Sequence, residues 1–207
     1  MFDARLRPLI DPPLNAIGRV LARSGIGANA VTLAGLIPAL GAGLAIAHHH
    51  YLLALALILI NRLLDGLDGA VARVRGISDL GGYLDTLGDF VFYTAVPLGF
   101  GFAAAANTAP AMVLIASFTL TCASFLAFAA IAAKRGAQTS AHGTKSFFYS
   151  TGLAEGAETI AVFAAMCLWP ALFPVIAWGF AALCLLTVVQ RSVMARRAFG
   201  GGSSGDD

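Results

Sequence analysis

Six long apolar runs constrain the fold of this chain more than any other feature. Judged by run length and by the breaks between them, they cover residues 28–48, 51–73, 82–104, 109–134, 152–170 and 172–194. An α-helix needs about 20 apolar residues to cross the ~30 Å hydrocarbon core of a bilayer. With 58% hydrophobic and only 12% charged residues, the composition is typical of a membrane protein. We therefore predict an all-α integral membrane protein with six transmembrane helices, forming one domain over residues 1–199.

The basic residues predict how these helices are oriented. All 13 Lys and Arg residues precede the first run, lie in or near the end of the second, separate the fourth from the fifth, or follow the start of the sixth. The turns after the first, third and fifth runs carry none. Because basic residues favour the cytoplasmic side, both termini are predicted to be cytoplasmic.

The two ends of the chain differ from the apolar middle. Asp11 and the two prolines after it are typical of a helix start. The apolar stripe that follows predicts an amphipathic interfacial helix over about 12–24, formed by Leu14, Ile17 and Leu21. The alternative is a plain cytoplasmic segment before the first span. The Gly, Ser and Asp residues of 200–207 cannot build a core, which predicts a disordered tail.

Four aspartates lie within 25 residues of an otherwise apolar sequence. Asp65 and Asp68 stand at i and i+3, and Asp85 and Asp89 at i and i+4, so each pair shares one helix face. At 1.5 Å per residue, Asp65 and Asp89 would lie roughly 9–10 Å below the cytoplasmic boundary, and Asp68 and Asp85 about 4–5 Å below it. We therefore expect the four carboxylates to meet in one site near the cytoplasmic face.

Four carboxylates in a low-dielectric site must be protonated or neutralised by cations. Oxygen ligands suit hard divalent ions such as Mg²⁺, Mn²⁺ or Ca²⁺, and two ions about 4 Å apart would clamp phosphoryl oxygens. Gly66 and Gly69 beside the acids weaken a helix for no packing reason visible in the sequence. The alternative is that the acids only pair with neighbouring arginines and hold a bundle together, the candidates being Arg62, Arg73 and Arg75.

The acidic stretch resembles the signature of the CDP-alcohol phosphatidyltransferases. The matching residues are Asp65, Asp68, Gly69, Ala72, Arg73, Gly81, Asp85 and Asp89. The spacer of seven residues, 74–80, departs from the eight found in many members. The resemblance implies transfer of a phosphatidyl group from a CDP-linked lipid such as CDP-diacylglycerol to a small alcohol, with release of CMP. It also implies two divalent cations, Mg²⁺ or Mn²⁺ with Ca²⁺ as a non-productive substitute, a homodimer in the bilayer, and no nucleic-acid partner.

The resemblance also assigns roles to individual residues. All four aspartates are metal ligands, and Asp89 is in addition the catalytic general base. The residues that bind the CDP group are Asp65, Asp68, Gly69, Ala72, Arg73, Gly81 and Asp85. For Arg73 we expect an ion pair with a signature aspartate, with the diphosphate as the alternative. Asn29 and Thr32 resemble an Asn-x-x-Thr of the family, although they also fit an ordinary helix start.

The acceptor pocket is less defined by the sequence. Candidates are Lys134, Lys145, Glu155, Glu158 and Arg191, with Arg135 and His142 as further polar residues nearby. Interfacial snorkelling is the simpler interpretation of the lysine at 134 and the arginine after it. Segments 142–149 and 152–159 resemble a bacterial inner-membrane branch of the family that has no known acceptor. This resemblance places the protein in the bacterial inner (plasma) membrane.

Two other functions fit parts of the pattern. A membrane prenyltransferase also uses intramembrane aspartates and Mg²⁺, but would be a longer chain with two separated acidic motifs. A non-enzymatic divalent-cation carrier would need acids near the midplane and a route to the far side. The far half of the predicted bundle has no acid, which argues against a carrier.

Overall fold

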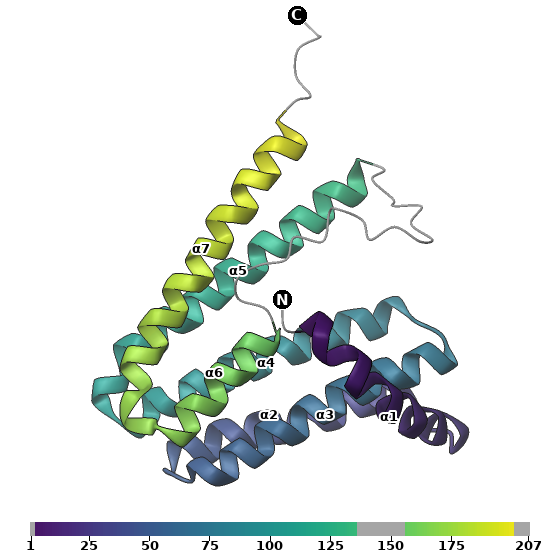
Figure 1. The fold of residues 1–207 in the computed structure, drawn as a ribbon, viewed down its shortest axis with the longest axis horizontal. Coiled ribbons are helices and arrows are strands. Elements are labelled where there is room, and N and C mark those ends of the chain that lie inside the picture. The colour runs from purple at the N-terminus through teal and green to yellow at the C-terminus, as the bar shows by residue number, and fades with distance from the viewer. Residues whose placement is uncertain (1–2, 136–155, 201–207) are drawn as a thin grey trace, which may run out of the picture.

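The computed structural model describes residues 3–135 and 156–200, and these residues form only helices (Figure 1). Within each described part, short connections and two single 3₁₀ turns join consecutive helices. In chain order the elements are α1 (Asp3–Arg23), α2 (Ala28–Ala47), α3 (Tyr51–Arg75), α4 (Asp79–Ala103), η1 (Ala105–Asn107), α5 (Thr108–Lys134), α6 (Gly156–Leu168), η2 (Pro170–Leu172) and α7 (Phe173–Phe199). The helices predicted from the apolar runs are thus confirmed where the structure describes them.

Four of these helical segments are long and apolar enough to cross a membrane: Ala28–Ala47, Asp79–Ala103, Ala105–Lys134 and Pro170–Phe199. α3 has 25 residues but carries charged side chains through its second half. α6 has 13 described residues, about 20 Å at 1.5 Å per residue. Residues 152–155, where the fifth run was predicted to begin, lie outside the described part. The fold is therefore a multi-pass membrane protein, and the count of six spans stays a prediction.

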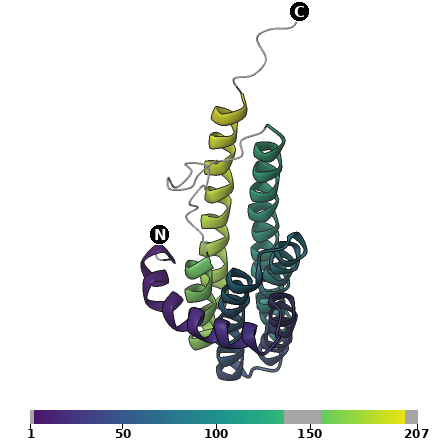
Figure 2. The same cartoon turned by 90° about the vertical axis from the view of Figure 1, so that its right-hand side faces the viewer.

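The helices form two groups that share one core. α2 packs against both α3 and α4, while the long helices α5 and α7 lie side by side (Figures 1 and 2). Fully buried aromatic side chains join the groups, and the rings of Phe100 on α4 and Phe173 on α7 stack at 4.3 Å. Phe92 on α4 meets Phe163 of α6 edge to face at 5.4 Å. The aromatic core therefore fixes α4 against the second group.

Small residues let α2 and α4 approach closely. A Cβ atom added to Gly43 would lie 2.5 Å from the carbonyl oxygen of Ala95, and one added to Gly99 would overlap the carbonyl oxygen of Gly43. No side chain fits between the backbones at these positions. Such contacts between small residues are a common way for helices to pack in membranes, and they hold α4 in register beside α2.

The first helix begins earlier than the sequence predicted. α1 runs without a break from Asp3, so Pro12 and Pro13 lie inside it rather than at its start. Proline has a φ of about −65°, which a helix accepts, at the cost of the hydrogen bonds that its missing N–H would donate. The predicted start at residue 12 was therefore wrong, while the end near residue 24 agrees with Arg23.

One face of α1 packs on α3 instead of lying free. Leu14 is buried in a cluster with Val31, Leu67 and Ala70, and Leu21 packs against that cluster. Ile17, the third residue of the predicted stripe, is 46% exposed. Leu14 and Leu21 therefore pack against the rest of the protein, whereas Ile17 faces outward.

Glycines make the contact between α1 and α3 possible. A Cβ added to Gly18 would lie 2.7 Å from the Cβ of Ala70, and one added to Gly66 would lie 2.7 Å from Cδ1 of Leu14. Gly66 therefore has a packing role that could not be seen in the sequence. Because Gly66 directly follows Asp65, α1 braces the helix turn that carries the first acidic pair.

The turn between α3 and α4 brings the two acidic stretches together. Gly76 follows α3 with φ +105°, a conformation that other residues rarely adopt. Ser78 then caps α4, its hydroxyl oxygen accepting a hydrogen bond from the backbone N–H of Gly81 at 3.1 Å. This cap explains why α4 begins at Asp79 and not at residue 82 as predicted.

Candidate active site

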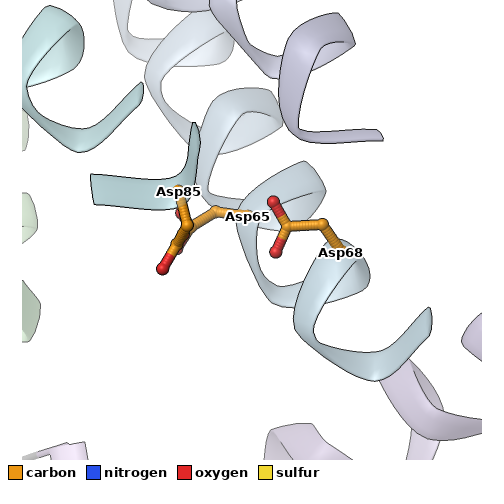
Figure 3. A group of neighbouring side chains, drawn as sticks. All are labelled: Asp65, Asp68 and Asp85. Carbon is orange, nitrogen blue, oxygen red and sulfur yellow. The ribbon is translucent and has the colours of Figure 1, made fainter. Parts of the chain in front are cut away.

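Three carboxylates from two helices converge in the structure. Asp65 and Asp68 extend from α3 and Asp85 from α4, and one carboxylate oxygen from each lies within 4.8 Å of the others (Figure 3). Asp68 is buried, Asp65 is half-buried and Asp85 is exposed. The i, i+3 spacing on α3 and the short turn before α4 produce this arrangement, which contains three of the four carboxylates that the sequence predicted would meet. A set of three oxygen ligands open on one side fits a hard divalent cation.

α2 adds a third wall to the site. The hydroxyl of Thr32 donates a hydrogen bond of 2.6 Å to Oδ2 of Asp68. A Cβ added to Gly81 would lie 3.2 Å from Oδ1 of Asn29, so both residues of the Asn-x-x-Thr stand at the signature helices. The interpretation of Thr32 as an ordinary helix-start residue is therefore insufficient, because its side chain holds a signature carboxylate.

The fourth signature carboxylate has a different partner. Oδ1 of Asp89 accepts a hydrogen bond from Nη1 of Arg62 at 3.0 Å, and the same nitrogen lies 3.6 Å from Oδ2 of Asp65. One guanidinium thus contacts Asp65 and Asp89, the two aspartates that the sequence predicted at similar depths. The group of mutually close carboxylates contains three members, and Asp89 stands beside it.

Several further contacts hold Arg62 in place. Its Nε and Nη2 both donate to Oδ1 of Asn61, at 2.9 and 2.7 Å, and Nδ2 of Asn61 donates to the backbone oxygen of Gly35 on α2 at 2.9 Å. The guanidinium carbon lies 4.2 Å from the centre of the Phe92 ring. Sequence reasoning named Arg62 only as a possible bundle-forming partner. A polar Asn61-Arg62 pair one turn before Asp65, inside an apolar run, is the signal that would have found it.

The polar groups of these three helices line one small recess. Its walls are the three converging aspartates, Thr32, Asn61 and Arg62, and Gly35 and Gly88 leave space between them. Every one of these side chains comes from α2, α3 or α4. The recess therefore combines fixed hydrogen-bond donors with negative charge, at the end of the bundle where α3 and α4 are joined.

Arg73 does not pair with a signature aspartate, so that expectation was wrong. Its Nη2 and Nε instead donate to Oδ1 of Asn15 on α1, at 2.9 and 3.2 Å. Arg73 stands in the last turn of α3, where α1 lies beside it, and Arg62 already occupies Asp65 and Asp89. Of the other predicted CDP contacts, Gly69 has only the Nη1 atom of Arg73 within 4 Å of a Cβ placed on it, at 3.5 Å. Ala72 is half-buried.

The predicted acceptor residues are not among those that line the recess in the described part of the chain. Lys134 is exposed at the end of α5, and Glu158 is half-buried in the first turn of α6. Arg191 is buried on α7 and donates to the backbone oxygen of Thr121 at 2.6 Å and to Oγ of Ser124 at 2.8 Å. Three further candidates, Lys145, Glu155 and His142, lie outside the described residues.

The three cysteines lie apart from the site. Cys167 and Cys184 are buried and Cys122 is half-buried, and all three are free thiols. None of them lines the recess around the carboxylates.

Comparison with known proteins identifies the signature. The model of the CDP-alcohol phosphatidyltransferase family matches residues 26–194. Inner membrane protein YnjF of Escherichia coli K12 is 47% identical over 192 residues, which cover 92% of this chain and 93% of that protein. Archaetidylinositol phosphate synthase of Pyrococcus horikoshii is 37% identical over 84 residues, covering 40% of this chain and 45% of the synthase.

Solved structures share the fold. Phosphatidylinositol phosphate synthase PgsA1 of Mycobacterium tuberculosis, in complex with manganese and citrate, matches with a TM-score of 0.70 at 20% identity, covering 94% of this chain and 93% of that one. The same enzyme with CDP-DAG bound matches with a TM-score of 0.67 at 22% identity, covering 94% and 98%. At this identity the likeness concerns the arrangement of helices.

Proposed function

The chain belongs to the CDP-alcohol phosphatidyltransferase family, and we propose that it transfers a phosphatidyl group from a CDP-linked lipid to an alcohol, releasing CMP. The observation that carries this proposal is the convergence of Asp65, Asp68 and Asp85 within 4.8 Å at the signature. Neither the prenyltransferase nor the cation-carrier alternative gains support from the family match. CDP-diacylglycerol is the donor that we propose, because a solved relative of the same fold holds CDP-DAG.

Divalent cations are the cofactors that the site fits best. Asp65, Asp68 and Asp85 supply oxygen ligands close enough to share an ion, and Asp89 lies one helix turn from Asp85 to serve a second. Mg²⁺ or Mn²⁺ bound there would neutralise the diphosphate of the donor. The manganese in the PgsA1 complex supports this choice. We expect Ca²⁺ to bind without supporting turnover.

The chain's own residues then have distinct roles. Asp89 is the proposed general base, which takes the proton of the acceptor hydroxyl as that oxygen attacks the phosphorus bound to the lipid. The bond from phosphorus to the CMP oxygen breaks, and CMP leaves with those electrons. Gly69 and Ala72 are proposed to permit close approach of the cytidine, and Gly81 and Arg73 are further proposed CDP-binding residues.

The recess lies at the end of the bundle where α3 and α4 meet, and we propose that this end faces the cytoplasm. The bias of Lys and Arg supports the assignment, together with six spans over residues 1–199, cytoplasmic termini and α1 at the interface. The name of YnjF, an inner membrane protein, supports placement in a bacterial inner membrane. A homodimer is proposed from the family alone.

The proposal is tested with purified protein, CDP-diacylglycerol and Mn²⁺ or Mg²⁺. CMP release is followed across a panel of acceptors that includes glycerol 3-phosphate, inositol phosphate, serine and inositol. We expect cation-dependent release with one acceptor, reduced at least 100-fold in Asp89→Asn. Asp79→Asn is the matched control, since Asp79 is a carboxylate on the same helix outside the signature.

The other outcomes separate the donor assignment from the choice of acceptor. If CDP-diacylglycerol binds in a cation-dependent manner but no acceptor yields CMP, the donor assignment stands and the acceptor lies outside the panel. If CDP-diacylglycerol does not bind at all, the donor assignment is wrong. Equal loss of activity in Asp79→Asn and Asp89→Asn would show that the effect is not specific to the signature.

A further inference from the structure

The contacts of Arg62 are unusual for a charge one turn from a cation site. An arginine that served only to neutralise the carboxylates would have to move away when a cation bound beside it, because like charges repel each other. Arg62 has little such freedom. Its side chain is 13% exposed, Asn61 holds two of its nitrogens, and the ring of Phe92 lies 4.2 Å beneath it.

A connected set of hydrogen bonds extends from α2 to α4 through this arginine. Gly35 accepts from Asn61, Asn61 accepts from Arg62, and Arg62 donates to Asp89. A guanidinium presents its donors in a fixed plane, so holding Nε and Nη2 on Asn61 also fixes the direction of Nη1. Nη1 is the atom that meets Asp89. The position of the Asp89 carboxylate is thus set from α2 and α3, not by α4 alone.

This arrangement divides the four aspartates into unequal groups. Asp65, Asp68 and Asp85 offer three mutually close oxygens, whereas the nearer oxygen of Asp89 is held by a positive charge at 3.0 Å. A cation that uses Asp89 must compete with the guanidinium for that oxygen and must approach a like charge. A cation among the other three meets only the weaker 3.6 Å contact of Arg62 with Asp65.

We propose that Arg62 is a positioning residue that holds Asp89 apart from the three-carboxylate group and so makes the two cation sites unequal in affinity. The first cation binds at Asp65, Asp68 and Asp85. The second binds more weakly, because Asp89 has to be released from Arg62. This inference rests on the proposed function, since it requires that the carboxylates bind divalent cations.

The inference is tested by titrating the purified full-length protein with Mn²⁺ alone and measuring free Mn²⁺ by electron paramagnetic resonance. We expect the unmodified protein to show two classes of site that differ at least tenfold in dissociation constant. In Arg62→Met the weaker class should tighten at least fivefold, because the competing charge is gone while an unbranched apolar side chain still fills the space of the arginine stem. Asp89→Asn should abolish the weaker class and leave the tighter one.

Arg75→Met is the matched charge control. Arg75 lies on the same helix, donates to the backbone oxygen of Gly25 at 2.7 Å and contacts no carboxylate among the described residues. The Arg75→Met variant removes one positive charge from α3 and should leave the dissociation constants of both classes of site within about twofold of those of the unmodified protein. If Arg62→Met does not fold, Asn61→Ala keeps the charge and removes the contacts that orient it, and the weaker class should tighten in the same direction.

The results separate this inference from the proposed function. A weaker class that is unchanged or weakened in Arg62→Met, or equal tightening in Arg75→Met, overturns the role of Arg62 and leaves the cation site standing. Two equal classes in the unmodified protein overturn it as well. Absence of Mn²⁺ binding in the unmodified protein overturns the proposed cation chemistry itself.

Discussion

The hydroxyl of Thr32 on α2 lies 2.6 Å from Oδ2 of Asp68 on α3. This hydrogen bond joins the first apolar helix to the acidic signature, although the two residues are 36 positions apart. Asp68 is the most buried of the three converging aspartates, 6% exposed. The hydrogen bond therefore restrains the orientation of a buried carboxylate that belongs to the three-carboxylate group.

Thr32→Val should therefore weaken the cation site without unfolding the protein. Partners that orient metal ligands are typically worth about 10–100-fold in metal affinity, so we expect the Mn²⁺ concentration for half-maximal CMP release to rise at least tenfold. Thr32→Ser, which keeps the hydroxyl, should stay close to the unmodified protein. Thr94→Val is the control, because Thr94 bonds only to backbone oxygens of its own helix. Equal effects of both valine variants would contradict a role for Thr32 at Asp68.

Removal of divalent cations should abolish activity reversibly. A chelator strips the ions that neutralise the diphosphate, so CMP release should fall below about 1% of its initial rate and return on addition of Mn²⁺ or Mg²⁺. Ca²⁺ should compete with Mn²⁺ and inhibit, because it takes longer bonds and a more variable geometry than the smaller ions. Full activity with Ca²⁺ alone, or activity that survives chelation, would contradict the proposed cofactor.

The sequence predicted the helices because they depend on local spacing, and it predicted that four carboxylates would meet. Three of them do, whereas Asp89 pairs with Arg62. Apolar run length determines where helices can cross a bilayer, and the i, i+3 separation of Asp65 and Asp68 fixes their common face. The family resemblance also rests on the spacing of these aspartates, and the comparisons confirm the family. The start of α4 was missed by three residues, because the Ser78 cap was not recognised.

The partners of the charged residues could not be predicted, because they depend on how helices pack. Arg62 and Arg73 lie on one helix near the same acids, yet Arg62 contacts Asp89 while Arg73 contacts Asn15. The choice follows from where α1 and α4 lie around α3, which no local pattern contains. The packing role of Gly66 was missed on the same ground, since Leu14 reaches it from a separate helix.

Gly18→Val should lower both stability and activity. The larger side chain would overlap Ala70 and the backbone beside it, and overpacking of this kind typically costs about 1–3 kcal/mol. Because α1 also braces Gly66, next to Asp65, its displacement should raise the Mn²⁺ requirement as well as lower the midpoint of thermal unfolding. Gly179→Val is the control, since nothing lies within 4 Å of a Cβ at Gly179. Full activity and stability in Gly18→Val would contradict the bracing role of α1.

Gly99→Ala should separate stability from the cation site. A methyl group at this position would overlap the backbone of Gly43, and a backbone atom cannot move aside as a side chain can, so α2 and α4 must part locally. We expect a loss of about 1–3 kcal/mol, seen as a lower midpoint of thermal unfolding. Position 99 is ten residues beyond Asp89 on α4, about 15 Å along the helix. The Mn²⁺ requirement of the folded fraction should therefore stay within about twofold, in contrast to Gly18→Val. A raised Mn²⁺ requirement in Gly99→Ala would mean that the local separation of α2 and α4 at position 99 also displaces Thr32 and Asp85.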